Sequence, residues 1–159
     1  PVPARPPQEP AAAAVPVAIR GAGRLVLVVD DEEPIRVVAE QVLRRHGFAV
    51  VVADDGVQAL QLFRLRPRDY AAAIVDMMMP RMNGAALMRE LRALAPGLAI
   101  ISSSGFMATA TDDGEPLDLE ALGVRTLLPK PYAESELLEA MREALEPAPP
   151  LGAGGKKKV

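Results

Sequence analysis

Five short apolar runs alternate along this chain with segments of helical period, and no other feature limits the possible folds as strongly. Each run is too short for a helix and has the continuous apolar character of a strand buried on both faces of a parallel sheet. The alternation therefore predicts an α/β fold with helices on both faces of one sheet. The predicted strands are residues 25–29, 48–53, 71–75, 98–101 and 124–128.

The order of these strands in the sheet decides which residues meet. We expect the order 2-1-3-4-5, the flavodoxin-like arrangement of doubly wound sheets, in which the first and third strands are neighbours. Open α/β sheets bind ligands at the carboxyl ends of the strands where the chain order reverses. Helices are predicted from Pro34 to residue 45, around Leu60, and at 85–94, 117–122 and 134–145.

The chain divides by composition into a central domain and two flanking segments. Residues 1–22 are rich in proline and alanine without helical or strand periodicity, so we expect a disordered linker. Residues 23–146 hold all five strands and form the predicted domain. Residues 147–159 follow the last helix, and we expect a flexible tail whose lysines at 156–158 serve only to solvate it.

Several classes of function are excluded by composition. The chain has no cysteine, which excludes disulfides, thiolate metal sites and cysteine nucleophiles. Its single histidine, His46, cannot form a multi-histidine metal site and is expected at a helix end, where it favours the helix dipole. The net charge of −3 predicts attraction to neither nucleic acid nor a membrane surface. No apolar run reaches the roughly 18 residues of a membrane helix.

Residues with carboxylate, hydroxyl or amino side chains, which can bind ligands or react, follow four of the five predicted strands. Asp30 and Asp31 follow the first strand, Asp76 the third, Ser104 the fourth and Lys130 the fifth. Each alone has an ordinary structural explanation, such as a helix cap or a turn. Because the carboxyl ends of parallel strands meet at one edge, we expect them to converge there. Clustered carboxylates without histidine or cysteine favour Mg²⁺, and a hydroxyl and an ammonium beside Asp76 suit a phosphoryl group.

Four short motifs surround these residues: Val-Val-Asp-Asp-Glu at 28–32, Asp76 with Met79-Pro80 and Gly84, Ser104-Gly105 and Lys130-Pro131. On these motifs, residues 24–146 resemble the receiver domain of the two-component response-regulator family. The resemblance implies that Asp76 takes a phosphoryl group from a phosphohistidine on a histidine kinase or a histidine phosphotransfer domain. It also implies that Lys130 contacts the phosphoryl group, that Ser104 is the switch hydroxyl, and that Pro131 is a candidate for a cis peptide bond.

The same resemblance implies a magnesium site and three residues that tune the response. Asp31 and Asp76 would bind Mg²⁺ directly together with the main-chain carbonyl of Met78, and Asp30 mostly through water. Met78 and Phe106 occupy the positions that control access of water to the phosphoryl group. Leu127 occupies a position where most receivers resembling this one carry an aromatic ring that moves on phosphorylation.

The resemblance fits two kinds of parent protein, a hybrid sensor histidine kinase and a free-standing response regulator. The phrase Ile-Ser-Ser-Ser-Gly-Phe at 101–106 and the glycine-rich entry at 21–24 resemble receivers at the carboxyl ends of hybrid sensor histidine kinases. We favour that origin over a free-standing regulator. A phosphorylation-independent binding module is the alternative from another functional class.

We expect the domain to be cytoplasmic, although the parent protein can be anchored in a membrane, and we expect at most a weak homodimer. The only catalysis expected is phosphorylation and dephosphorylation of the domain itself.

Overall fold

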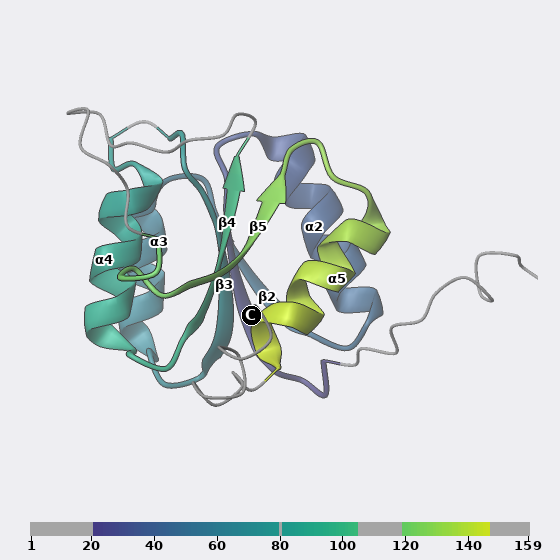
Figure 1. Cartoon of the computed structure of the whole chain (residues 1–159), viewed down its shortest axis with the longest axis horizontal. Coiled ribbons are helices and arrows are strands. Elements are labelled where there is room, and N and C mark those ends of the chain that lie inside the picture. Colours follow the sequence, from purple (N-terminus) through teal and green to yellow (C-terminus); the bar gives the residue numbers. More distant parts are fainter. Residues whose placement is uncertain (1–20, 80, 105–118, 147–159) are drawn as a thin grey trace, which may run out of the picture.

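The computed structural model describes residues 21–79, 81–104 and 119–146, in which helices and strands alternate (Figure 1). The predicted tail, Phe106 and nearly all of the predicted linker lie outside these residues. None of the described helices is both long and apolar enough to cross a membrane. The elements are β1 (Leu25–Val29), α2 (Glu33–Arg45), β2 (Ala49–Ala53), α3 (Gly56–Leu65), β3 (Tyr70–Asp76), α4 (Gly84–Leu94), β4 (Ala99–Ser104), β5 (Val124–Pro129) and α5 (Glu134–Leu145).

The five strands form one parallel sheet in the order β2-β1-β3-β4-β5, which confirms the predicted flavodoxin-like topology. Helices α2 and α5 cover one face of the sheet, and α3 and α4 lie side by side on the other (Figure 1). Strands β1 and β3 are the two inner neighbours at the point of chain reversal. Their carboxyl ends are therefore where a ligand site is expected.

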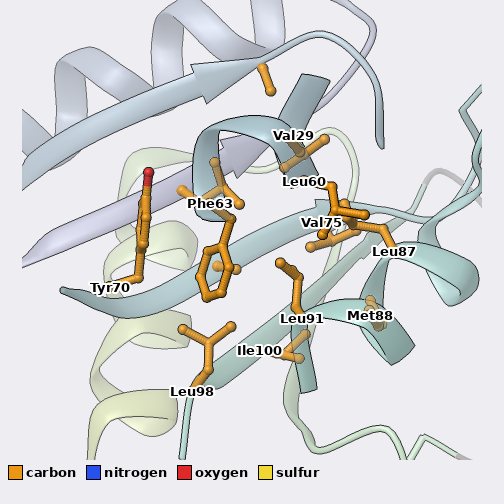
Figure 2. Close-up of a cluster of buried hydrophobic side chains, with 14 of the residues drawn as sticks. Val29, Leu60, Phe63, Tyr70, Val75, Leu87, Met88, Leu91, Leu98 and Ile100 are labelled. Carbon is orange, nitrogen blue, oxygen red and sulfur yellow. The ribbon is translucent and has the colours of Figure 1, made fainter. Parts of the chain in front are cut away.

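Each face of the sheet has its own hydrophobic core, which explains why the inner strand β1 is apolar at every position. In β1, Leu25, Leu27 and Val29 pack toward α3 and α4, whereas Val26 and Val28 pack toward α2 and α5. Figure 2 shows the core on the α3 and α4 side, where the ring of Tyr70 stacks on that of Phe63 with centroids 4.8 Å apart. Both cores anchor β1 and β3, so the ends of these strands are held rigidly.

Local sequence signals set the ends of the helices. Pro34 lies in the first turn of α2, where its missing N–H needs no partner. Gly47 follows α2 with φ +91°, a conformation that glycine adopts without steric cost. The Asp55 and Asn83 carboxylate and amide oxygens accept the N–H groups of Gln58 and Ala86, which caps α3 and α4.

Two segments differ from the sequence prediction. Strand β3 extends to Asp76, which pairs with Ser103 of β4. Strand β4 extends to Ser104, which pairs with Pro129 of β5. The described part of the predicted helix at 117–122 forms turns instead. There the N–H of Val124 donates to the carbonyl of Leu119, and Gly123 has φ +80°.

Candidate functional site

The polar residues at the carboxyl edge of the sheet come from β1, β3 and β5. Asp30 follows Val29, Asp76 ends β3, and Lys130 follows Pro129. The alternation of side chains places Asp30 and Asp76 on the same face as Val28 and Ile74, which pack toward α2 and α5. Both carboxylates are 2% exposed, so the sheet carries two nearly buried acidic groups on neighbouring strands.

Lys130 joins the two carboxylates. Its Nζ lies 3.1 Å from Oδ2 of Asp30 and 3.3 Å from Oδ2 of Asp76, and the Lys130 side chain is only 10% exposed. Oε2 of Glu32 lies 3.5 Å from the same Nζ. The Lys130 main-chain N–H donates to the carbonyl of Ser104 at 2.8 Å, which fixes the lysine to the end of β4. The Lys130–Pro131 peptide bond is cis.

Main-chain N–H groups orient both carboxylates. Oδ1 of Asp30 accepts the N–H of Glu32 at 2.9 Å, and Oδ1 of Asp76 accepts the N–H of Met78 at 3.1 Å. Arg36 from the first turns of α2 donates through Nη1 to the carbonyl of Asp30 at 2.7 Å. Asp76 thus has one oxygen held by its own loop and the other turned toward Lys130, whereas Nζ of Lys130 donates to both oxygens of Asp30, at 3.4 Å to Oδ1 and 3.1 Å to Oδ2. Such charge-assisted hydrogen bonds define side-chain orientation well.

Burial and neighbouring charges perturb the acid–base chemistry of the site. Burial of the carboxylate, with the nearby charge of Asp30, raises the pKa of Asp76 to about 6, against the opposing effects of the Met78 N–H and of Lys130. Burial lowers the pKa of Lys130, but the hydrogen bond and charge of Asp30 and the charges of Asp76 and Glu32 outweigh it and raise the pKa overall. The lysine therefore stays protonated at neutral pH.

An acidic cluster beside Lys130 has the chemistry of a divalent-cation site. One carboxylate oxygen each from Asp30, Asp31 and Glu32 lies within 4.8 Å of the others, and Asp31 and Glu32 are exposed to solvent. A donor set of carboxylate oxygens fits a hard cation such as Mg²⁺. Glu32 was not among the predicted ligands. The acidic run at 30–33 is the sequence signal for it, but only the structure shows which of these acids face one another.

The remaining predicted residues lie around this centre. Ser104 is partly buried at the end of β4, and the Met78 side chain is 59% exposed in the loop after β3. Leu127 lies on β5 and is 50% exposed, whereas its neighbour Leu128 is buried in the core toward α2 and α5. The structure thus brings Asp30, Asp76 and Lys130 into direct contact.

Gly84 explains how α4 begins so close to the site. A Cβ at Gly84 would lie 2.5 Å from the carbonyl oxygen of Asp76 and 2.7 Å from Cα of Met77. Real Cβ atoms do not approach backbone atoms so closely, so any larger residue would push α4 away from the end of β3. The glycine therefore keeps the loop after Asp76 short and tight.

The sequence matches one family model over most of its length. That family is the response regulator receiver domain, and the match covers residues 26–142.

Two curated proteins illustrate the similarity. The response regulator MprA of Mycobacterium sp. (strain KMS) is 36% identical over 126 residues, which are 79% of this chain and 52% of MprA. The sensor kinase CckA of Brucella abortus (strain 2308) is 32% identical over 121 residues, which are 76% of this chain and 12% of CckA. The chain thus spans about half of one relative and about an eighth of the other.

Solved structures of the same architecture include both single-domain and kinase receivers. The receiver domain of the hybrid histidine kinase CckA is similar with a TM-score of 0.64 and 29% identity, covering 77% of this chain and 99% of that domain. The chemotaxis protein CheY4 of Vibrio cholerae is similar with a TM-score of 0.68 and 25% identity, covering 78% of this chain and all of that protein, 100%.

Proposed function

Because the chain belongs to the response regulator receiver domain family, we propose that Asp76 accepts a phosphoryl group and that the domain acts as a switch in a two-component or phosphorelay pathway. The observation that carries the proposal is the placement of Lys130 between the Asp30 and Asp76 carboxylates at the carboxyl edge of the sheet. A nucleophile with a cation beside it is the arrangement that phosphoryl transfer requires.

In the proposed reaction the phosphoryl group comes from a phosphohistidine of a histidine kinase or phosphotransfer domain. A carboxylate oxygen of Asp76 forms a bond to phosphorus while the bond from phosphorus to the imidazole nitrogen breaks. The bonding electron pair stays on that nitrogen, and the ring, protonated on its other nitrogen, leaves as neutral imidazole. The product is an aspartyl phosphate, and the domain catalyses no reaction other than this transfer and the later hydrolysis.

Two residues of the chain would stabilise the transferred group. Lys130 already approaches Oδ2 of Asp76 at 3.3 Å, so its ammonium needs only a small movement to neutralise a phosphoryl oxygen bound there. Ser104 ends the neighbouring strand β4, and in this proposal its hydroxyl would donate to a second phosphoryl oxygen. These contacts form only when the phosphoryl group is present, so they link phosphorylation to movement of Lys130 and Ser104.

The donor chemistry of the site supports a requirement for Mg²⁺. We assign Asp31, Asp76 and the Met78 carbonyl as direct ligands and Asp30 as a ligand through water, and we add Glu32 from the observed acidic cluster. A cation bound there would supply positive charge that offsets the negative charge of the phosphoryl oxygens. The chain's own carboxylates would hold the cation, and the N–H of Met78, which donates to Oδ1 of Asp76 at 3.1 Å, would keep that carboxylate oriented for attack.

We further propose that the parent protein is a hybrid histidine kinase. The similarity to CckA in both sequence and structure supports this origin. The higher identity with MprA supports the alternative of a response regulator. The reading frame upstream of Pro1 distinguishes them, because a kinase core encoded there would establish the hybrid origin.

The proposal is tested by incubating the full chain with acetyl phosphate and measuring its intact mass. The wild-type protein with Mg²⁺ should gain the mass of one phosphoryl group, and Asp76→Asn should gain none. Asp69→Asn, a change in an exposed ion pair with Arg66, is the matched control and should be phosphorylated normally. Labelling of Asp76→Asn, or equal labelling in chelator, would overturn the assignment. An unphosphorylated wild-type protein would instead favour a phosphorylation-independent binding module.

A further inference from the structure

The loop between Asp76 and α4 is held by hydrogen bonds at both ends. At its start, the N–H of Met77 donates to the carbonyl of Ser103 at 2.9 Å. At its end, the N–H of Gly84 donates to the carbonyl of Met77 at 3.2 Å, and Asn83 caps α4. The loop also carries Met78, whose N–H holds the Asp76 carboxylate. The position of this loop therefore determines the orientation of the Asp76 carboxylate, the proposed phosphoryl acceptor.

A third attachment fixes the loop to α3, an element outside the site described above. The guanidinium of Arg81 donates to Oδ2 of Asp55, a carboxylate that is only 4% exposed. The other oxygen of Asp55 accepts the N–H of Gln58 at 2.8 Å and so caps α3. Arg81 has φ +67°, a conformation that residues with a side chain rarely adopt. Such a conformation persists only where surrounding contacts hold it.

Close packing accompanies the ion pair. A Cβ at Gly56, the first residue of α3, would lie 2.8 Å from Cβ of Met82 and 2.9 Å from its carbonyl oxygen. The loop thus passes directly over the first turn of α3, and glycine is the residue that leaves room for it. Helices α3 and α4 lie side by side on this face of the sheet (Figure 1), so the contact joins the start of one helix to the loop that leads into the other.

We propose that Asp55 and Arg81 are positioning residues for the phosphoacceptor site, acting through the loop that holds Met78. Their ion pair fastens the middle of the loop to the rigid start of α3, and this sets the Met78 carbonyl and N–H relative to Asp76. The inference rests on the proposed function, because Met78 is assigned there as a ligand of Mg²⁺. Neither Asp55 nor Arg81 contacts the phosphoryl group or the cation in this account.

The chain offers variants that remove the ion pair while preserving the local backbone. Asp55→Asn keeps an oxygen able to cap α3, since asparagine is as good an N-cap as aspartate. Arg81→Asn suits a positive φ, because asparagine is enriched in that region. Arg81→Lys retains the positive charge. Arg64→Asn is the control, since Arg64 forms an exposed ion pair with Glu90 on the outer side of α3 and α4.

The test measures the affinity of the full chain for Mg²⁺. MgCl₂ is titrated into the protein, and the NMR signals of the backbone amides report binding. Asp55→Asn and Arg81→Asn should each weaken Mg²⁺ binding about 3- to 10-fold, less than the roughly 10- to 100-fold loss typical of groups that contact a metal ligand directly, because the ion pair acts through the loop. The double variant should be no more than about 2-fold weaker than either single variant, because each removes the same contact. Arg81→Lys should bind within about 2-fold of wild type, as should the Arg64→Asn control.

Stability measurements separate positioning from a purely structural role. Variants with a lower urea midpoint but wild-type affinity for Mg²⁺ would overturn the inference, as would full additivity in the double variant. Arg81→Asn changes an exposed side chain, so this variant carries the test even if Asp55→Asn fails to fold. If wild type binds Mg²⁺ but Asp76 is never phosphorylated, the proposed function fails. If Asp76 is phosphorylated and the variants bind Mg²⁺ normally, only the positioning role fails.

Discussion

Replacing Asp76 with asparagine should stabilise the Mg²⁺-free protein at neutral pH. Burial beside Asp30 raises the pKa of Asp76 from 3.8 to about 6, so the folded state penalises the charged form. A rise of about two pH units corresponds to about 3 kcal/mol, since each unit is worth 1.36 kcal/mol. Asparagine is uncharged and retains an oxygen for the Met78 N–H, so it removes this penalty. The loss of one partner of Lys130 offsets part of the gain, which makes about 3 kcal/mol an upper limit.

The pH dependence of the effect follows from the direction of the shift. Between pH of about 4 and about 6 the folded protein binds more protons at Asp76 than the unfolded chain does, so the stability of wild type falls as pH rises through this window. The Asp76→Asn variant lacks this loss. The two proteins should therefore have similar stability near pH 4, and the difference should reach its full size above pH 7.

Urea unfolding of both proteins in chelator, at several pH values, measures this difference directly. Addition of Mg²⁺ should largely cancel this difference, because a cation that binds folded wild type more tightly than the variant adds up to about 2.7 kcal/mol at 100 times the dissociation constant. A variant that is no more stable than wild type at pH 7.5, or a difference that does not change with pH, would refute the electrostatic reasoning.

Four further changes have defined outcomes. Lys130→Ala should destabilise the Mg²⁺-free protein by about 3–5 kcal/mol in urea unfolding, with much of the loss restored by Mg²⁺, because it leaves the buried Asp30 and Asp76 carboxylates without their cation. Ser103→Ala should be neutral or stabilise by about 1 kcal/mol, because the Ser103 hydroxyl is buried without a hydrogen-bond partner. Gly123→Ala should lower stability by about 1–3 kcal/mol, since φ is +80° and a Cβ would meet Arg92. Met78→Asn should shorten the half-life of the phosphorylated protein several-fold, measured by loss of phosphoryl mass, since its exposed position then carries a group able to orient water.

The convergence of Asp30, Asp76 and Lys130 was predictable because it depends only on topology. Once the chain alternates strands with helices and the sheet is parallel, the residues that follow the strands must meet at one edge. The strand order was predicted from the same alternation and is confirmed. What periodicity does not give is the side-chain geometry, such as which oxygen of each carboxylate faces Lys130.

The contact of Arg81 with Asp55 shows where sequence reasoning ends. The run Asp54-Asp55-Gly56 predicts a turn into a helix, and Asp55 does cap α3. Nothing in the sequence indicates that its second oxygen binds a residue 26 positions further along the chain. Arginine has no preference for positive φ, so the conformation of Arg81 is imposed by tertiary contacts. Glu32 is similar, because an acidic run does not reveal which of its members share a cluster.

The central claim is that the Asp76 carboxylate accepts a phosphoryl group from a donor in which phosphorus is bonded to nitrogen. Phosphoramidate, which has a bond from phosphorus to nitrogen as phosphohistidine does, serves as the donor in the presence of Mg²⁺. Reduction of the product with borohydride converts an aspartyl phosphate to homoserine, and peptide mass spectrometry then locates it. The account predicts homoserine at position 76 and at no other aspartate, with none formed in chelator. Homoserine at Asp30 or Asp31, or its absence from position 76 despite phosphorylation, would contradict the account.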